Sequence, residues 1–223
     1  MAYVAPTTRS VGDAVTVADY NIMANNDIQI ATMARGVFTT EAVRDAAITS
    51  PTEGMIVYLT APTVPAATGT LTAAPTTGIK TIYNGSVWVC VTPGSAATSA
   101  TGTTIATTYS ASLSGSPGTN PSVTLVTGTT ALITHSFFGS QAGVGHLAYQ
   151  SVAISGAGAV AASADWEGYM FNGVAALQTN VSTTQIITGL TAGTNTFTLQ
   201  YKSSSASQVA TILLRRLVVQ GVA

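Results

Sequence analysis

The stretch NTFTLQYKSSSASQVATILLRRLVVQG, Asn195–Gly221, decides the fold class of this chain. Its first part alternates, so that Phe197, Leu199 and Tyr201 share one side of an extended segment and threonines take the other. This pattern predicts a strand with one buried face. Its second part is apolar on both sides, apart from one threonine and a pair of arginines. An antiparallel strand of that kind needs a second layer or a second subunit over its second face.

In strict alternation, the apolar residues of the second part divide into two sets. The first set is Ala210, Ile212, Leu214 and Val218, and the second is Val209, Leu213, Leu217 and Val219. The arginines, Arg215 and Arg216, must then point to opposite faces. Because an unpaired charge inside a dry core is costly, the inward arginine should lie near a sheet edge or find a partner. We expect at least one of them to cross a subunit interface.

The composition favours a protein that assembles with other copies or other proteins. Only 7% of the 223 residues are charged, the net charge is −1, and 46% of the residues are hydrophobic. A surface of this kind has little charge repulsion to keep copies apart. The absence of a basic cluster argues against nucleic acid and against an anionic membrane as partners.

Other whole-chain features exclude several classes of protein. Cys90 is the single cysteine, so an internal disulfide is impossible and a disulfide-stapled fold is excluded; we expect Cys90 to be a small core residue. The opening residues lack the basic and apolar regions of a signal peptide. No run of 18 apolar residues occurs in the sequence, which predicts no transmembrane helix.

The N-terminal part, residues 1–36, predicts an arm followed by one helix from Val17 to Arg35, with Gly36 as its stop. Its apolar stripe is Ile22, Met23, Ile30 and Met33, with Asn26 in the same stripe. One polar residue in such a seam can fix the register of a helical bundle. A helix that lies on its own domain would show the same pattern, and the sequence leaves both interpretations open.

Residues 37–91 predict a small β module. Thr40 can cap a short helical turn that runs through Ala47, and Met55–Thr60 has the composition of a strand. Residues 61–78 form a Pro/Thr/Ala-rich segment that we expect to be a loop with little packing. Asn84-Gly85 between two β-rich runs is the signature of a type I′ hairpin. The segment 92–102 has the composition of a flexible linker.

Residues 103–223 predict a C-terminal β-sandwich of the jelly-roll kind, since short strands follow one another with turn signals between them and no helical period. The fold class is therefore mainly β. The expected strands are Ile105–Leu113, Val123–Val126, Ala131–Phe138, Leu147–Ser155, Trp166–Asn172, Thr184–Thr188, Thr196–Tyr201 and Val209–Gln220.

The sequence offers little catalytic chemistry. The only histidines, His135 and His146, have no nearby acids or cysteine at zinc-ligand spacing, and no nucleophile elbow or phosphate-binding loop occurs. Asp165 and Glu167 would share one face of a strand, but a glycosidase draws its carboxylates from separate elements and a calcium site needs more oxygens. We expect no enzyme, no cofactor and no metal.

Aromatic residues in the same region could contact a sugar ring. Tyr149, Trp166 and Tyr169 are the candidates for glycan contact, although such side chains are more often part of a core. The candidate residues for an oligomer interface come from the N-terminal helix and from the doubly apolar strand: Ile22, Asn26, Ile30, Met33, Leu213, Arg215 and Arg216.

Several stretches resemble tailed-bacteriophage virion proteins. GDAVTVADYNIMANNDI resembles their N-terminal helix, and RDAAITSPTEGMIVYLT followed by IYNGSVWV is similar to a small β module of phage minor tail and fibre proteins. TGTTALITHSFF, GLTAGTNTFTLQYK and RRLVV resemble the C-terminal jelly rolls of minor tail proteins and virion appendages. The segment Ala61–Gly78 is longer than this module usually has. The resemblance implies a homotrimer that binds other virion proteins or a host surface.

These observations together predict a non-enzymatic virion protein, a trimeric minor tail or fibre protein that attaches by its N-terminal part and projects its sandwich. A head fibre or capsid decoration protein is the alternative within the class. A carbohydrate-binding or host-receptor-binding module is the alternative from another class. Its expected location is the virion, assembled in the host cytoplasm, which agrees with the absence of a signal peptide.

Overall fold

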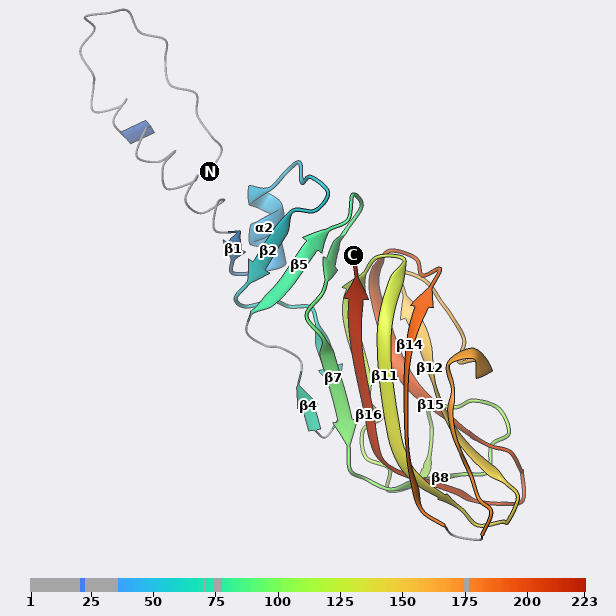
Figure 1. Ribbon diagram of the computed structural model, residues 1–223. Helices are drawn as coiled ribbons and strands as arrows, with labels where there is room; N and C mark the ends of the chain where they lie inside the picture. Colours follow the sequence, from blue (N-terminus) through green and yellow to red (C-terminus); the bar gives the residue numbers. More distant parts are fainter. Residues whose placement is uncertain (1–20, 23–35, 70, 74–77, 175–176) are drawn as a thin grey trace, which may run out of the picture.

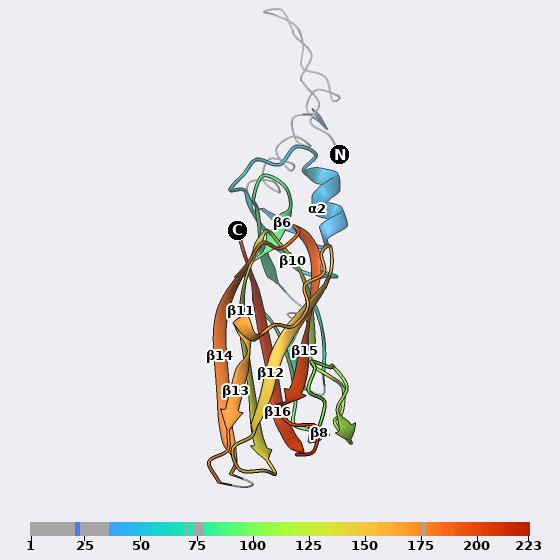
Figure 2. The ribbon, with the colours of Figure 1, turned by 90° about the vertical axis from the view of Figure 1, so that its right-hand side faces the viewer.

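The computed structural model describes residues 21–22, 36–69, 71–73, 78–174 and 177–223. It is mainly β, with a small module at one end of an elongated sandwich (Figures 1 and 2). The C-terminus lies at the end of the sandwich that meets the module, and the loops 142–146 and 204–209 lie at the opposite end. We call that opposite end the free end.

The sandwich is a jelly roll, as the sequence predicts. One sheet has the order β14-β11-β16-β7 and the other the order β13-β12-β15-β10, so that consecutive strands repeatedly cross between sheets. These strands are β7 (Gly94–Thr98), β10 (Ser122–Thr127), β11 (Thr130–Gln141), β12 (Leu147–Gly156), β13 (Gly168–Phe171), β14 (Thr179–Thr188), β15 (Gly193–Ser203) and β16 (Ala210–Val222). We call the first the β16 sheet and the second the β15 sheet.

The core lies between the two sheets because the long strands alternate in burial along their length. In β11, every second residue from Ala131 to Gln141 is buried. Phe197, Leu199 and Tyr201 of β15 are fully buried, which confirms the one-sided strand that the sequence predicts. At about 25 cal/mol per Å² of apolar area, this burial is the main favourable term in the folding free energy.

The segment 61–78, which we expected to be a loop with little packing, instead extends both sheets. Within it, β3 (Ala66–Thr68) pairs with β10, and β4 (Leu71–Ala73) pairs with β7. The expectation is wrong because main-chain pairing to an existing sheet edge needs no large side chains. Pro65 just before β3 is buried.

The predicted flexible linker, 92–102, is also a correction, because it holds a strand of the jelly roll. Strand β7 pairs along β16 from Arg215↔Thr98 to Val219↔Gly94. A short hairpin follows, in which β8 (Gly102–Thr104) pairs with β16 and with β9 (Ser114–Gly115). A small residue lets β7 pack closely on the opposite sheet, since a Cβ on Gly94 would stand 2.7 Å from Cγ1 of Val123 on β10. Small residues also make the segment resemble a linker in composition.

The module is a four-stranded sheet covered by one short helix. The sheet order is β1-β2-β5-β6, with bounds β1 (Val37–Phe38), β2 (Ile56–Leu59), β5 (Ile79–Tyr83) and β6 (Trp88–Cys90). Helix α2 (Glu41–Ala47) begins where Thr40 Oγ1 accepts a hydrogen bond from Val43 N, as predicted for the cap. The strand predicted at Met55–Thr60 is confirmed as β2.

The hairpin between β5 and β6 is confirmed, but its turn differs from the prediction. A type I′ turn needs positive φ at both Asn84 and Gly85, whereas only Gly85 has it, at 87°. Asn84 instead precedes the turn, where its Oδ1 accepts hydrogen bonds from the N–H groups of Ser86 and Val87. The asparagine thus serves as a side-chain acceptor rather than as a left-handed residue.

The module and the sandwich share one continuous core. Trp88 and Cys90 are buried in the same cluster as the sandwich residues, and Gln220 Nε2 donates to the Val91 carbonyl at 2.8 Å. A Cβ on Gly221 would stand 2.7 Å from the Cys90 carbonyl oxygen, so that the glycine allows β16 to approach the module closely. Burial also raises the pKa of the Cys90 thiol to about 11, in line with its predicted role as a small core residue.

The doubly apolar strand is explained by a β-bulge. Between β11 and β16 the register shifts, so that Arg216 pairs with Ser136 while Leu213 pairs with Phe138. Leu214 has a φ of +49°, a left-handed value that one class of bulge adopts, usually with glycine at that position. Before the bulge Ile212 is buried, and after it Leu217 and Val219 are buried. The bulge therefore lets β16 turn one face to the core along its whole length, although both alternating sets of residues are apolar.

Two of the predicted strands need further correction. Ile105–Leu113 is not a strand, because within it only Ser110 forms a bridge, to Tyr201. The strand predicted at Trp166–Asn172 begins later, since a single 3₁₀ turn, η1 (Ala164–Trp166), precedes β13.

Candidate functional site

The predicted interface residues of the N-terminal helix lie mostly outside the described residues. Asn26, Ile30 and Met33 belong to this group. Ile22 is described, and it is helical and half-buried.

The predicted interface residues of β16 separate to the two faces of their sheet. Arg216 is exposed on the outer face, in a shallow depression lined also by Ser136, Phe138, Asn180 and Leu214. Leu213 is half-buried beside Phe138, its partner on β11. The outer face of the β16 sheet is therefore the surface on which these two residues are accessible.

Arg215 lies inside the sandwich, where a neighbouring subunit cannot reach it, in contrast to our expectation of an interface residue. Its side chain is 1% exposed. Nη2 donates to the carbonyl of Pro117, and Nη1 lies 3.3 Å from the Tyr201 hydroxyl and 3.5 Å from Asn120 Oδ1. The guanidinium also stands 5.4 Å from the centre of the Tyr201 ring. The expectation that the inward arginine finds partners is met by neutral oxygens of the chain itself.

The aromatic residues predicted to contact a glycan do not form a single group. Tyr149 and Tyr169 face each other across β12 and β13 on the outer face of the β15 sheet, with ring centres 6.1 Å apart. Trp166 is half-buried against the core, and its Nε1 donates to the Val152 carbonyl at 2.9 Å. Trp166 is therefore a packing residue rather than a surface aromatic.

The structure adds a lysine, a glutamate and a third tyrosine to the tyrosine pair. Lys202 Nζ lies 4.3 Å from the centre of the Tyr109 ring and 4.4 Å from that of Tyr149. The same ammonium forms an ion pair with Glu167 at 3.2 Å, and the Tyr109 hydroxyl donates to the same carboxylate oxygen. We call Tyr109, Tyr149, Glu167, Tyr169 and Lys202 the tyrosine platform.

Electrostatics in the platform favour a fixed arrangement. Burial and the nearby Glu167 carboxylate raise the pKa of Tyr109 above its usual range, and they also raise that of Tyr149. Both hydroxyls are therefore neutral at pH 7. An ammonium held between two ring faces is stabilised by the ring quadrupoles as well as by its carboxylate partner.

Sequence reasoning missed Tyr109 and Lys202 for a physical reason. Lys202 lies opposite Tyr149 in the pairing of β12 with β15, and a single sequence does not reveal strand register. Tyr109 comes from the segment wrongly predicted as a strand, and it reaches the platform because its neighbour Ser110 bridges to Tyr201. The sequence signal that was available is the alternation of Tyr169 and Phe171 in β13, which are 56% and 57% exposed.

The acids Asp165 and Glu167 do not act as a pair. Asp165 bonds to Ser163 at the start of η1, whereas Glu167 belongs to the platform. Among the described residues, no group of three or more His, Cys, Asp and Glu could hold a metal ion. No helix in the described part of the chain is long and apolar enough to cross a membrane.

His135 is a buried neutral side chain next to the platform. Its Nδ1 accepts from Gln150 Nε2 at 3.0 Å, and its Nε2 lies 2.9 Å from the Trp166 carbonyl, to which it donates in this tautomer. Burial lowers its pKa, against a smaller opposing effect of the Trp166 carbonyl. The sequence predicts a half-buried sheet residue, and the structure buries it further.

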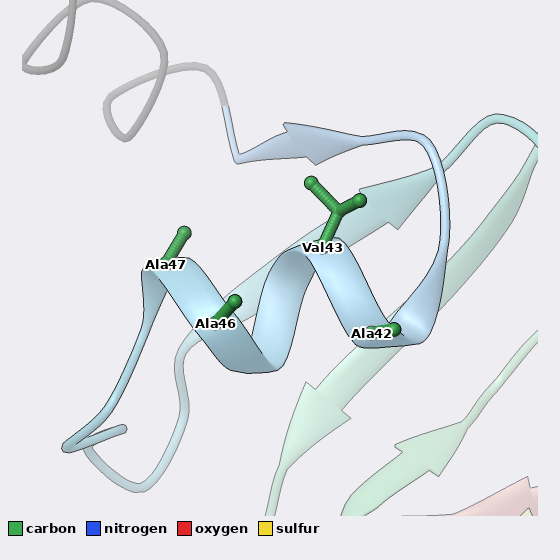
Figure 3. A pocket seen from close by; sticks show the side chains of 4 residues that line it. All are labelled: Ala42, Val43, Ala46 and Ala47. Atoms are coloured by element: carbon green, nitrogen blue, oxygen red, sulfur yellow. The ribbon is translucent and has the colours of Figure 1, made fainter. Parts of the chain in front are cut away.

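The module presents a different kind of surface. A shallow apolar depression on the exposed side of α2 is lined by the side chains of Ala42, Val43, Ala46 and Ala47 (Figure 3). Glu41, in the first turn of α2, accepts hydrogen bonds from the backbone N–H groups of Thr63 and Val64. Burial acts to raise the pKa of Glu41, but these hydrogen bonds outweigh it and lower the pKa.

Comparisons with known proteins find solved structures of similar shape but assign the chain to no family. No protein-family model matches the chain, and no curated protein matches it. Among solved structures, one titled Eiger TNF from S. frugiperda is similar over 77% of this chain and 94% of that one, with 7% identity and a TM-score of 0.35.

A second solved structure, titled infectious bursal disease virus Gx strain, is similar over 64% of this chain and 41% of that one, with 14% identity and a TM-score of 0.37. Both TM-scores are low, so neither likeness bears on what this chain does.

Proposed function

We propose that this chain is a structural, non-enzymatic protein of a tailed-bacteriophage virion, a minor tail or fibre protein that attaches through its N-terminal part and projects its jelly roll. The observation that carries the proposal is the polarity of the molecule. The module lies at one end of the sandwich, and the loops 142–146 and 204–209 lie at the other (Figure 1). The resembling stretches 44–60 and 82–89 lie in the module, and the C-terminal resembling stretches lie in strands β11, β15 and β16 of the sandwich.

Surface chemistry supports attachment at the module end. Val37, Ile56 and Tyr58 are 41%, 53% and 45% exposed on one face of the module sheet, and Val43 is 47% exposed on α2. Exposed apolar side chains that share one face of a sheet, as Val37, Ile56 and Tyr58 do, are typical of protein contact surfaces. A head fibre or capsid decoration protein would attach in the same way, so the location on the particle distinguishes the two.

Locating the chain on intact particles tests the proposal. We expect antibodies against the loop 142–146 to label the virion at the tail in electron micrographs. Val43→Asp should reduce incorporation into particles, whereas Val144→Asp, at an exposed valine of the free end, should not. Labelling of the head would favour the decoration protein. Particles that contain none of the chain would refute a virion role.

We also propose that the protein forms a homo-oligomer, a trimer by the resemblance described above. Ile186, Leu214 and Val218 are 64%, 43% and 37% exposed on the outer face of the β16 sheet, and Arg216 is the charged residue among them. An apolar face with one guanidinium can pack against a copy that supplies a carboxylate or carbonyl oxygens. Light scattering of the unaltered protein and of Val218→Asp tests this. The aspartate should weaken the oligomer, and a stable monomer of the unaltered protein at micromolar concentration would refute the proposal.

A second candidate function is a carbohydrate-binding or host-receptor-binding module. The observation that favours it is the exposure of Tyr169 and Phe171 on the β15 sheet, toward the free end, since Phe171 pairs with Leu147 directly after the loop 142–146. A receptor site at that end would be compatible with attachment at the other.

A further inference from the structure

We propose that the tyrosine platform and Phe171 form a binding site for a neutral glycan, with Tyr169 and Phe171 stacking on consecutive sugar rings. This inference develops the second candidate function and requires no virion. Tyr169 and Phe171 are two residues apart on β13, and therefore their side chains leave the same face of the sheet roughly 7 Å apart. Both rings are more than half exposed, so each can offer a flat apolar surface.

The rings are held in place before any ligand arrives. Tyr169 is paired across the strands with Tyr149, and their planes are inclined by 49°. Tyr149 in turn packs against the Lys202 ammonium, which is fixed by Glu167 and by the ring of Tyr109. A site that is already ordered loses less conformational entropy on binding than a flexible one.

Polar groups that suit sugar hydroxyls lie beside the stacking surface. The Lys202 and Tyr109 bonds both end on Oε2 of Glu167, so that Oε1 makes no hydrogen bond among the described residues. A carboxylate oxygen is a strong acceptor for a hydroxyl donor. A pyranose ring has an apolar C–H face and hydroxyls around its rim, and this combination matches an aromatic face next to a carboxylate.

The charge of the platform favours a neutral ligand. Lys202 and Glu167 neutralise each other, and both side chains are mostly covered, at 21% and 15% exposed. An anionic sugar would meet the Glu167 carboxylate, and a phosphate would find no free guanidinium there, since Arg215 is inside the sandwich and Arg216 is on the other sheet. The proposed ligand class is therefore an uncharged oligosaccharide of at least two hexopyranose units.

The test is binding of the full chain to a panel of neutral tri- to hexasaccharides of glucose, galactose, mannose and N-acetylglucosamine, with sialylated and sulfated oligosaccharides alongside. We expect binding to at least one neutral member. Tyr169→Ala and Phe171→Ala should each weaken it by roughly tenfold or more, because truncation of a stacking anchor removes a dominant contact. Tyr169→Trp should retain binding, and Glu167→Gln should weaken it less than the ring truncations do.

A matched control is Tyr58→Ala, at a tyrosine of similar exposure on the module, which should leave glycan binding unchanged. Thermal melting verifies that each variant is folded. Absence of binding to every neutral member, or binding that Tyr169→Ala and Phe171→Ala do not change, would overturn the proposal. Preference for the acidic sugars would overturn the assignment of a neutral ligand. If Tyr169→Ala instead dissociates an oligomer and no sugar binds, the platform is a protein contact. None of these outcomes depends on where the chain lies in a virion.

Discussion

Strands β15 and β16 follow one another in the sequence, lie in opposite sheets and bury their side chains by different rules. From Asn195 to Ser203, β15 buries every second residue without interruption. In β16 the alternation changes phase at Leu214, so that Ile212 and Leu217 face the same core although they are five positions apart, an odd offset that would put them on opposite faces of a regular strand. A strand that reads as apolar on both sides can therefore have one buried face and a bulge.

The two strands also meet inside the sandwich. Arg215 owes its inward position to the bulge, and its guanidinium contacts the hydroxyl of Tyr201 on β15. Without the phase change, Arg215 and Ile212 would point to opposite faces. The polar contact between the strands thus depends on the irregularity in one of them.

Neighbouring residues of β16 offer the test with the largest expected effect. Leu217 is fully buried and Val218 is 37% exposed. Leu217→Ala should lower the free energy of unfolding by about 2–5 kcal/mol, because it removes buried methyl groups and leaves a cavity. Val218→Ala should lower it by less than about 1 kcal/mol. Urea denaturation measures both free energies of unfolding. Equal losses of stability would mean that Leu217 and Val218 do not differ in burial as they do in this structure.

Removal of one atom, the hydroxyl oxygen of Tyr201, should weaken the contact between the strands. Tyr201→Phe should cost about 1–3 kcal/mol, since the hydroxyl donates to Asn120 Oδ1 at 2.7 Å and both Asn120 and Arg215 would lose a buried partner. Tyr169→Phe is the control, because that tyrosine is 56% exposed. A loss for Tyr201→Phe no larger than for the control would show that water replaces the hydroxyl.

The contrast between β15 and β16 shows which features of the fold can be predicted from the sequence and which cannot. Regular alternation predicted β10, β11, β12 and β15 and hence the sandwich, because side-chain burial in a regular strand has a period of two. It could not find the bulge, since Leu214 is a poor residue for positive φ and gives no glycine signal there. Nor could it find β3, β4 and β7, whose small residues are placed by pairing with neighbouring strands rather than by their own pattern.

The candidate site was predicted in part, for the same reason. Tyr149 and Tyr169 were selected by residue type, and the pairing of their strands brings them together. Lys202 and Tyr109 join them through strand register and through an irregular segment, neither of which has a local sequence signal. Trp166 was selected by type as well, but it packs inward because η1 turns it toward Val152.

Acidification should weaken the β16 sheet through His135, which pairs with Leu217 in the register of β11 with β16. The folded pKa of His135 is lowered, mainly by burial, so the unfolded chain binds a proton first as the pH falls. Stability from this group is fully present above the unfolded pKa of about 6.5 and is lost as the pH drops through the folded pKa. Melting temperatures between pH 7.5 and 5 measure the effect.

Variants at the two histidines separate this effect from other titrations. His146→Gln should keep the pH dependence, while His135→Gln should reduce it and lower stability at all pH values, because Gln150 and the Trp166 carbonyl lose their present partner. An unchanged pH dependence in His135→Gln would assign the titration to other groups. Carboxylates titrate mainly below about pH 5, outside the range compared.

The smallest expected effect concerns the bulge itself and tests it most directly. Leu214 has a φ of +49°, a conformation that costs a residue with a Cβ about 1–2 kcal/mol. Asn tolerates this conformation, so Leu214→Asn should stabilise the protein by about 0.5–1 kcal/mol, although the exposed leucine loses some packing. Leu214→Val should destabilise it, because a β-branched side chain fits positive φ worst. Leu214→Gly should be nearly neutral, since relief of strain is offset by the greater entropy of the unfolded chain.

The neighbouring Leu213 supplies the matched control for these substitutions. It is half-buried and has no positive φ, so Leu213→Asn should destabilise the protein where Leu214→Asn stabilises it. Chemical denaturation, analysed with one dependence of the unfolding free energy on denaturant concentration for all variants, gives the differences in stability. If both asparagine variants are equally destabilising, Leu214 has ordinary strand geometry in solution. In that case Leu217 and Ile212 could not share a face, and the unequal losses expected for Leu217→Ala and Val218→Ala should also fail, because one bulge accounts for both results.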